Sequence, residues 1–184
     1  MEVEPGRPAK LTFRKAREDE ADLIATLTNS AYRGDSSRLG WTTEANLLDG
    51  QRTDSDEILS LIRNPQSMML LCLQDNEVIG SLNLQKEGDS GYLGMLVVKP
   101  LLQGRGIGKE FIRAAELTAL REWGVAKMTM TVISFRPELL GYYERRGYCR
   151  TGEFKAFPKD PRGGIPLVDG LQLEVLEKEI VNGD

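Results

Sequence analysis

Apolar and polar residues follow two different periods along this chain, and each period predicts one kind of element. Residues 11–16 alternate apolar and polar side chains, which is typical of a half-buried strand. Residues 18–31 instead repeat apolar side chains every three or four positions, which indicates a helix. Seven strands are predicted in all, at residues 11–16, 68–74, 78–85, 91–98, 128–132, 148–154 and 171–181. Four helices are predicted, at residues 18–31, 56–63, 106–123 and 137–146.

The order of these elements, β-α-α-β-β-β-α-β-α-β-β, predicts an α/β (α+β) fold. A mixed seven-stranded sheet with helices on both faces is expected. A chain of 184 residues can close one sizeable core, so residues 1–184 are expected to form a single domain. Residues 32–56 have no clear period and are expected to be irregular or only partly helical. Residues 155–169, rich in proline and glycine, are expected to form a stiff loop.

The composition narrows the class of protein. The chain is 40% hydrophobic and 28% charged, which favours a soluble globular fold. Its net charge is −4 and it has no basic tract, so nucleic acid is not expected as a partner. No apolar run approaches the about 18–20 residues of a membrane span, and the acidic N-terminus does not resemble a signal peptide. A cytoplasmic location is therefore expected. Cys72 and Cys149 fall in predicted strands and are expected to be free, buried thiols.

The chain contains no histidine, and this excludes several kinds of site. Ser-His-Asp and Cys-His catalysis, the usual zinc sites and an imidazole base all require that residue. No metal is expected. Any proton transfer must then involve Glu, Asp, Tyr, Cys, backbone groups or water.

Three glycines follow a buried strand and open an amphipathic helix. Residues 95–98 form the apolar run, and Gly104, Gly106 and Gly108 stand at the helix start. The first amides of a helix lack internal partners and carry partial positive charge, and glycine removes the Cβ atoms that would keep an anion away. Arg105 and Lys109 add positive charge beside the same place. This arrangement predicts a site for a phosphate-bearing ligand.

Spacing separates the known phosphate-binding patterns. A P-loop fails twice, because Gln103 stands at its first glycine and Glu110 at its Ser/Thr. A dinucleotide fingerprint fails because the third glycine is Gly108 and not residue 109. What remains is Gln-x-x-Gly-x-Gly directly after Val-x-Pro, with a purely structural glycine turn as the alternative.

That pattern, at residues 103–108, resembles motif A of the GNAT superfamily of acyl-CoA-dependent N-acyltransferases. A second match lies at residues 139–148, which resemble the family's helix with a tyrosine followed by x-x-x-Gly-aromatic. The resemblance implies a GNAT-like fold, acetyl-CoA as cofactor and transfer of its acetyl group to a primary amine of a small molecule. It allows a homodimer. The alternative is a non-catalytic acyl-CoA-binding or regulatory module on the same fold.

The resemblance also implies site residues. Tyr143 would protonate the departing thiolate, with a structural core aromatic as the alternative; only one of Tyr142 and Tyr143 is expected to face the cofactor. Arg136 stands where many members have asparagine, and would reach a phosphate or cap its helix. The residues implied for the cofactor are Leu96, Val97 and Val98 along the pantetheine arm, Gln103, Gly104, Arg105, Gly106, Ile107 and Gly108 around the pyrophosphate, and Lys109 beside them.

The acceptor side is less well defined. Residues 31–44 occupy the region where GNAT acceptors bind and are similar to the corresponding loop of one subgroup of the family. The candidates for a small polar amine are Arg33, Arg38, Trp41, Thr42 and Glu44, and a solvated loop with Trp41 over the core is the alternative. The family's usual fourth-strand carboxylate has no counterpart in residues 91–95. Glu116 is expected to be a carboxylate on a helix face and not the base.

Overall fold

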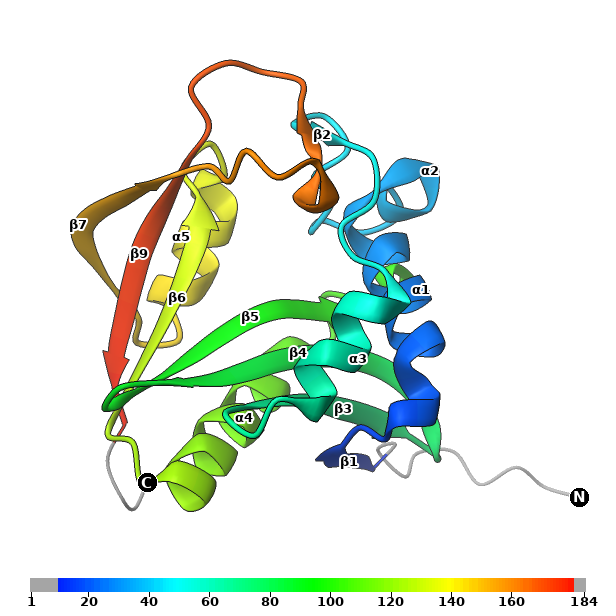
Figure 1. Ribbon diagram of the computed structural model, residues 1–184, viewed down its shortest axis with the longest axis vertical. Coiled ribbons are helices and arrows are strands. Elements are labelled where there is room, and N and C mark those ends of the chain that lie inside the picture. The colour runs from blue at the N-terminus through cyan, green and yellow to red at the C-terminus, as the bar shows by residue number, and fades with distance from the viewer. Residues whose placement is uncertain (1–9, 181–184) are drawn as a thin grey trace, which may run out of the picture.

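The computed structural model describes residues 10–180, which form a seven-stranded sheet with helices on both faces (Figure 1). The strand order is β1-β3-β4-β5-β6-β9-β7, and neighbours are antiparallel except the parallel pair β5 and β6. The strands of this sheet are β1 (Leu11–Lys15), β3 (Ser67–Gln74), β4 (Glu77–Glu87), β5 (Ser90–Val98), β6 (Lys127–Ile133), β7 (Cys149–Ala156) and β9 (Gln172–Glu179). The helices are α1 (Ala21–Tyr32), α2 (Gly34–Ser37), α3 (Ser55–Arg63), α4 (Ile107–Trp123) and α5 (Pro137–Glu144), with 3-10 turns η1 (Glu18–Glu20), η2 (Pro100–Leu102) and η3 (Pro161–Gly163). The predicted fold class is confirmed.

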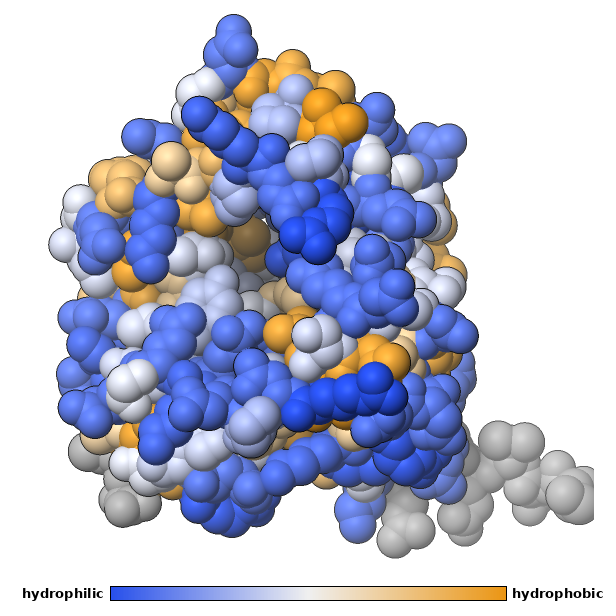
Figure 2. Space-filling model, viewed as in Figure 1, coloured by the Kyte–Doolittle hydropathy of each residue, from blue (hydrophilic) through white to orange (hydrophobic). Residues whose placement is uncertain are grey.

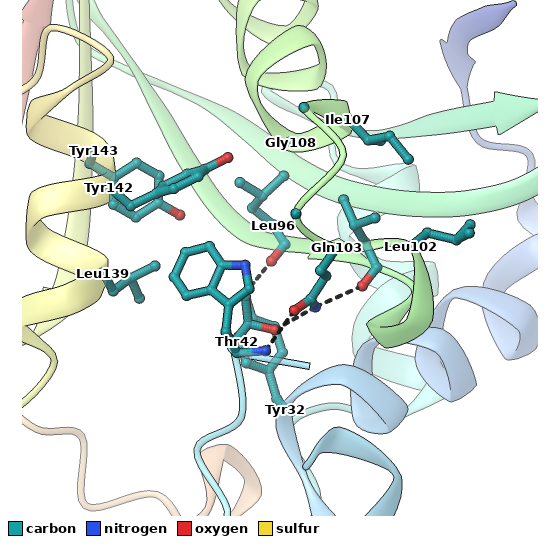
Figure 3. Close-up of a pocket in the computed structure, with 14 residues that line it drawn as sticks. Tyr32, Thr42, Leu96, Leu102, Gln103, Ile107, Gly108, Leu139, Tyr142 and Tyr143 are labelled. Atoms are coloured by element: carbon teal, nitrogen blue, oxygen red, sulfur yellow. Dashed lines mark hydrogen bonds between the residues drawn. The ribbon is translucent and has the colours of Figure 1, made fainter. Parts of the chain in front are cut away.

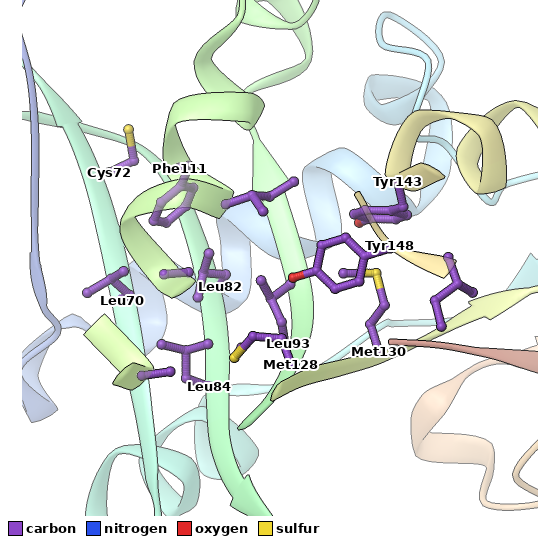
Figure 4. Packing of buried hydrophobic residues seen from close by; sticks show 14 of the residues in the cluster. Leu70, Cys72, Leu82, Leu84, Leu93, Phe111, Met128, Met130, Tyr143 and Tyr148 are labelled. Atoms are coloured by element: carbon purple, nitrogen blue, oxygen red, sulfur yellow. The ribbon is translucent and has the colours of Figure 1, made fainter. Parts of the chain in front are cut away.

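Strand β3 explains why helices cover both faces of the sheet. It is apolar at nearly every position, as expected of a strand buried on both sides. Met69, Leu71 and Leu73 pack with α1 and α3. Leu70 and Cys72 point to the other face, into the cluster that contains Phe111 of α4 (Figure 4). The sheet is thus the middle layer of three, and α4 is fixed against it by its own apolar side.

Strands β5 and β6 separate part of the way along the sheet, as Figure 1 shows. Their pairing extends only from Ser90 opposite Lys127 to Tyr92 opposite Thr129. Beyond it, Met95 has a positive φ of 53° and the register with β4 shifts, which marks a β-bulge that redirects the strand. The last residues of β5 therefore have no strand beside them on the β6 side.

Two segments predicted to be irregular are joined by a small second sheet. Residues 32–56 contain α2 and β2 (Leu48–Asp49), and β2 pairs with β8 (Ile165–Pro166) from the proline-rich stretch. Leu48 packs with Ile133 and Leu171 beneath this pair. The expectation of a mere loop at residues 155–169 was wrong in this respect, because a two-residue pairing across the chain leaves no period in the sequence.

The two cysteines are free but differ in burial. Cys72 is buried on β3, and burial, with a smaller effect from the charge of Glu110, raises the pKa of its thiol to about 12. Cys149 is exposed, so the expectation that both are buried was wrong for it. The reason is that β7 is an edge strand whose residues are all exposed. No helix within residues 10–180 is long and apolar enough to cross a membrane.

Candidate active site

A pocket lies where β5 leaves β6, between the start of α4, helix α5 and the segment after α2 (Figure 3). On the molecular surface of Figure 2, a hollow opens near the centre of the face, with apolar atoms visible inside it. Aromatic, aliphatic, amide and hydroxyl groups make up the wall of the pocket. The lining residues are Tyr32, Trp41, Thr42, Leu96, Val98, Leu102, Gln103, Gly104, Gly106, Ile107, Gly108, Leu139, Tyr142 and Tyr143.

The glycine-rich stretch, residues 103–108, forms one wall and is here called the cofactor loop, after the ligand that the sequence predicts for it. Gly104 and Gly106 have φ values of 78° and 81°, a conformation that favours glycine, and open space lies where their side chains would be. Gly106 is the N-cap of α4 and supplies no side-chain cap, so the first amides of the helix have no capping side chain. Arg105 and Lys109 are exposed and are not part of the lining.

The end of β5 forms the adjoining wall. Leu96 and Val98 line the pocket, whereas Val97 pairs with Ser81 of β4 and packs against α1. The hydroxyl of Tyr32 donates a hydrogen bond to the carbonyl of Leu96. The side-chain amide of Gln103 donates to the carbonyl of Val98 at 3.0 Å. Leu96 and Val98 therefore face the pocket and the residue between them does not, because successive residues of a strand point in opposite directions.

Tyr143 reaches the pocket from α5 and is also part of the core. It is only 7% exposed and makes edge contacts with Tyr142 and Tyr148, at ring-centroid distances of 5.3 and 6.1 Å. Burial, helped by the neighbouring phenols of Tyr32, Tyr142 and Tyr92, raises its pKa well above the usual value of 10. The hydroxyl therefore stays protonated at neutral pH, so it is available to donate a hydrogen bond or a proton.

Tyr142 also lines the pocket, so the expectation that only one of the two tyrosines faces it was wrong. The ring of Tyr142 packs on that of Trp41, with centroids 4.9 Å apart. The guanidinium of Arg146, just after α5, lies 3.3 Å from the centroid of the Tyr142 ring. A side chain at Gly108 would collide with the Tyr142 hydroxyl, so that glycine admits the phenol to the start of α4. Both tyrosines reach the pocket although they are consecutive on the helix, because their side chains are long and their ring centroids lie only 5.3 Å apart.

Sequence reasoning missed four lining residues: Tyr32, Leu102, Leu139 and Tyr142. Tyr32 had the clearest signal, because it is an aromatic at the end of a predicted helix next to the acceptor candidates. Its phenol is buried, which raises its pKa, and the charge of Glu44 raises it further. Tyr32 is thus a second protonated hydroxyl in the pocket.

The acceptor candidates divide into two groups. Trp41 and Thr42 line the pocket. Arg33 and Glu44 are buried and form an ion pair with each other, and a second nitrogen of Arg33 donates to the carbonyl of Gly163 at 2.9 Å. Arg38 is exposed and donates to the side chain of Asn46. Trp41 and Thr42 thus border the pocket. The buried Arg33, through Glu44 and Gly163, instead connects the segment after α1 to the stretch that precedes β8.

Two further charged candidates are engaged with the protein itself. Arg136 is buried at the N-cap of α5, and donates to Glu138 and, at 3.2 Å, to the carbonyl of Trp41. Glu116 lies on α4 and accepts from Lys178 at 2.8 Å and from the Tyr148 hydroxyl at 3.0 Å. Within residues 10–180 no cluster of three or more His, Cys, Asp or Glu side chains could hold a metal ion.

Several solved structures share this architecture. The spermidine N-acetyltransferase from Vibrio cholerae in complex with CoA and spermine aligns with a TM-score of 0.68 at 15% identity, covering 92% of this chain and 95% of that one. The ribosomal-protein-S18-alanine N-acetyltransferase from Escherichia coli aligns with a TM-score of 0.67 at 12% identity, covering 95% and 97%. At these identities the likeness concerns the fold.

Sequence comparison identifies the family directly. Comparison with curated proteins gives no significant match. The profile of the acetyltransferase (GNAT) family, however, matches residues 15–148, which is most of the chain and includes the cofactor loop and Tyr143. The chain is therefore a member of the GNAT family of acetyltransferases.

Proposed function

We propose that this protein transfers the acetyl group of acetyl-CoA to a primary amine of a small molecule, by direct attack in a ternary complex. The observation that carries the proposal is a single pocket that joins three features. These are the open amides of the cofactor loop, the free edge of β5 and the protonated hydroxyl of Tyr143. A non-catalytic acyl-CoA-binding module would need the first two features but not the third.

The cofactor loop suits the pyrophosphate of coenzyme A. Open space lies beside Gly104 and Gly106, where other residues would carry a Cβ, and the uncapped start of α4 offers its amides and partial positive charge. The backbone N–H groups of Leu96 and Val98 would hold the pantetheine arm along the free edge of β5, because the carbonyls of both residues already accept from Tyr32 and Gln103. Arg105 and Lys109 are exposed, so each adds only a weak, salt-sensitive attraction. Acetyl-CoA supplies an acyl thioester, which an amine can attack.

Tyr143 is assigned the acid role at the leaving sulfur. Its raised pKa means that the phenol is fully protonated but a weaker acid than free tyrosine. It therefore acts best as a hydrogen-bond donor that passes its proton only as negative charge develops on the sulfur. Trp41 and Thr42 border the acceptor side of the same pocket.

The remaining features belong to the same proposal. Residues 1–184 are taken as one catalytic domain, and the two free thiols fit a reducing, cytoplasmic setting. The relative from Vibrio cholerae binds spermine, and small primary amines of that general kind are the first acceptors to test. A homodimer stays a prediction.

The proposal is tested in two steps on the purified protein. Acetyl-CoA at about 100 times its Kd should stabilise the fold by about 2.7 kcal/mol, which raises the Tm by several degrees. A panel of primary amines with acetyl-CoA should then release free thiol. A Tm shift without thiol release from any amine supports the non-catalytic module, and the absence of any shift with acetyl-CoA contradicts both functions.

A further inference from the structure

The side chain of Gln103 connects the two sides of the pocket. Its amide oxygen accepts a hydrogen bond from the backbone N–H of Trp41 at 2.9 Å. Its amide nitrogen donates to the hydroxyl of Thr42 at 2.8 Å and to the carbonyl of Val98 at 3.0 Å (Figure 3). The partners fix the orientation of the amide, because a backbone N–H can meet only the oxygen and a carbonyl only the nitrogen. The oxygen and the nitrogen of one side-chain amide thus join the segment at residues 41–42 to the end of β5.

The segment at residues 40–42 is shaped to receive this side chain. A Cβ at Gly40 would collide with the Gln103 amide, so glycine allows the close approach. Trp41 packs on Tyr142 of α5, and its carbonyl accepts from Arg136. The segment is therefore held from the cofactor loop on one side and from α5 on the other, with the pocket between them.

We infer that Gln103 is a positioning residue that ties the acceptor side of the pocket to the occupancy of the cofactor loop. The inference rests on the proposed function for what binds there. Its backbone belongs to the loop that would hold the pyrophosphate, whereas its side chain holds residues 40–42. Ligand contacts that immobilise the loop therefore immobilise Trp41 and Thr42 as well. Such a link is a coupling between two sites, and it acts in both directions.

Trp41 reports on this link without any knowledge of the acceptor. The chain has two tryptophans, and the other, Trp123, lies at the end of α4. A Trp123→Phe parent leaves Trp41 as the single fluorophore. In this parent, coenzyme A should lower acrylamide quenching of Trp41 by about twofold, because the segment that carries it becomes less mobile.

Gln103→Met in the same background keeps the length of the side chain and removes its hydrogen bonds. Trp41 should then be quenched about twofold more readily without ligand, and the protection by coenzyme A should be clearly smaller than in the parent, leaving only direct cover of a side chain that lines the pocket. The Kd for coenzyme A from calorimetry should change by less than about threefold, because the backbone amides of the loop are kept. Thr42→Val, which removes one of the three contacts, should produce a smaller change in the same direction.

The control is Gln172→Ala, which removes an exposed glutamine on β9. Quenching and protection should match the parent. Equal quenching of Trp41 in the parent, Gln103→Met and Thr42→Val would overturn the inference, as would protection by coenzyme A that is as large in both variants as in the parent. A parent that gives no heat with coenzyme A would contradict the proposed function instead, and the quenching without ligand would still decide the role of Gln103.

Discussion

The two sides of the pocket, proposed above to bind the cofactor and the acceptor, differ in their supporting contacts. One side is held by residues close in sequence and the other by residues far away in the chain. On the cofactor side, the end of β5, η2, the cofactor loop and the start of α4 are consecutive in sequence. On the acceptor side, residues 33–44 are held by partners far away in the chain, such as Gly163 for Arg33 and Arg136 for Trp41. The cofactor side is a local structure, and the acceptor side exists only once the whole fold is assembled.

This difference indicates where each side is sensitive to change. A local structure depends on backbone conformation, so its critical residues are the glycines with positive φ and the helix start. A side built from distant contacts depends on buried polar and charged pairs, whose loss leaves a group without its partner. Substitutions should therefore impair binding on the cofactor side and stability on the acceptor side.

The largest effect is expected from Gly106→Glu. The substitution places a side chain with negative charge at the N-cap of α4, on a residue with a φ of 81°. Coenzyme A affinity, measured by calorimetry, should fall by about three orders of magnitude or more. The new side chain blocks the anion site, and its negative charge repels the pyrophosphate. The circular dichroism spectrum should be kept.

Gly88→Glu is the matched control. Gly88 also has a positive φ, with open space around it, but lies in the turn between β4 and β5 and not in the pocket. It carries the same backbone strain and the same added charge, so it should keep coenzyme A binding. Equal loss in both variants would show that strain, and not the site, caused the effect.

The same contrast explains what could be predicted from the sequence. The cofactor loop was recognisable because glycines, a strand and a helix start are adjacent, and Gly124 correctly marked the end of α4 with its left-handed conformation. The pairing of β2 with β8 and the Arg33–Glu44 ion pair were not recognisable. They depend on residues separated by long stretches of chain, or on which charged side chains become buried, and neither leaves a period or a motif.

Arg33→Gln should have the next largest effect, on stability. It leaves Glu44 buried without its counter-charge and removes the contact with the Gly163 carbonyl. Breaking a buried pair in this way costs about 3–5 kcal/mol of unfolding free energy, measurable by urea denaturation. The double variant Arg33→Met with Glu44→Leu should recover most of the loss, because no unpaired charge remains. A loss below about 1 kcal/mol in the single variant would contradict a structural role for the pair.

Tyr143→Phe tests the chemistry at the boundary between the two sides. Turnover should fall by about 10²-fold with an amine that the panel identifies, while coenzyme A affinity is kept, because only the donor at the leaving sulfur is lost. Tyr142→Phe is the control, since Tyr142 lines the same pocket and its ring can still pack on Trp41. Turnover that is unchanged in Tyr143→Phe would make Tyr143 a core aromatic.

The smallest effect is expected at the N-terminus of α1, the helix that precedes the acceptor side in the chain. Glu20 accepts two hydrogen bonds from Arg14, at 2.7 and 2.9 Å, and one from the N–H of Arg17. The hydrogen bonding from Arg14 is the main reason that the pKa of Glu20 falls to about 2, against the opposing effect of burial. A carboxyl whose pKa is lower in the folded state stabilises the fold above its unfolded value, near 4.5, and this stabilisation is lost as the pH falls toward 2.

Glu20→Gln should therefore lower the unfolding free energy by about 1–2 kcal/mol at pH 7, a figure reduced for solvent screening because the Arg14 side chain is 37% exposed. The difference from the unmodified protein should shrink steadily between pH 4.5 and 2, as followed by urea denaturation at several pH values. Glu18→Gln, on the same turn, removes a carboxylate paired with Arg63 on the open surface, and should cost far less. If both variants lose the same stability at pH 7, the anchor of α1 is only a surface contact. If only Glu20→Gln loses stability at pH 7 and this loss disappears as the pH falls, the ion pair between Glu20 and Arg14 stabilises α1. The acceptor side, which follows α1 in the chain, then depends on a short-range contact as well as on its long-range ones.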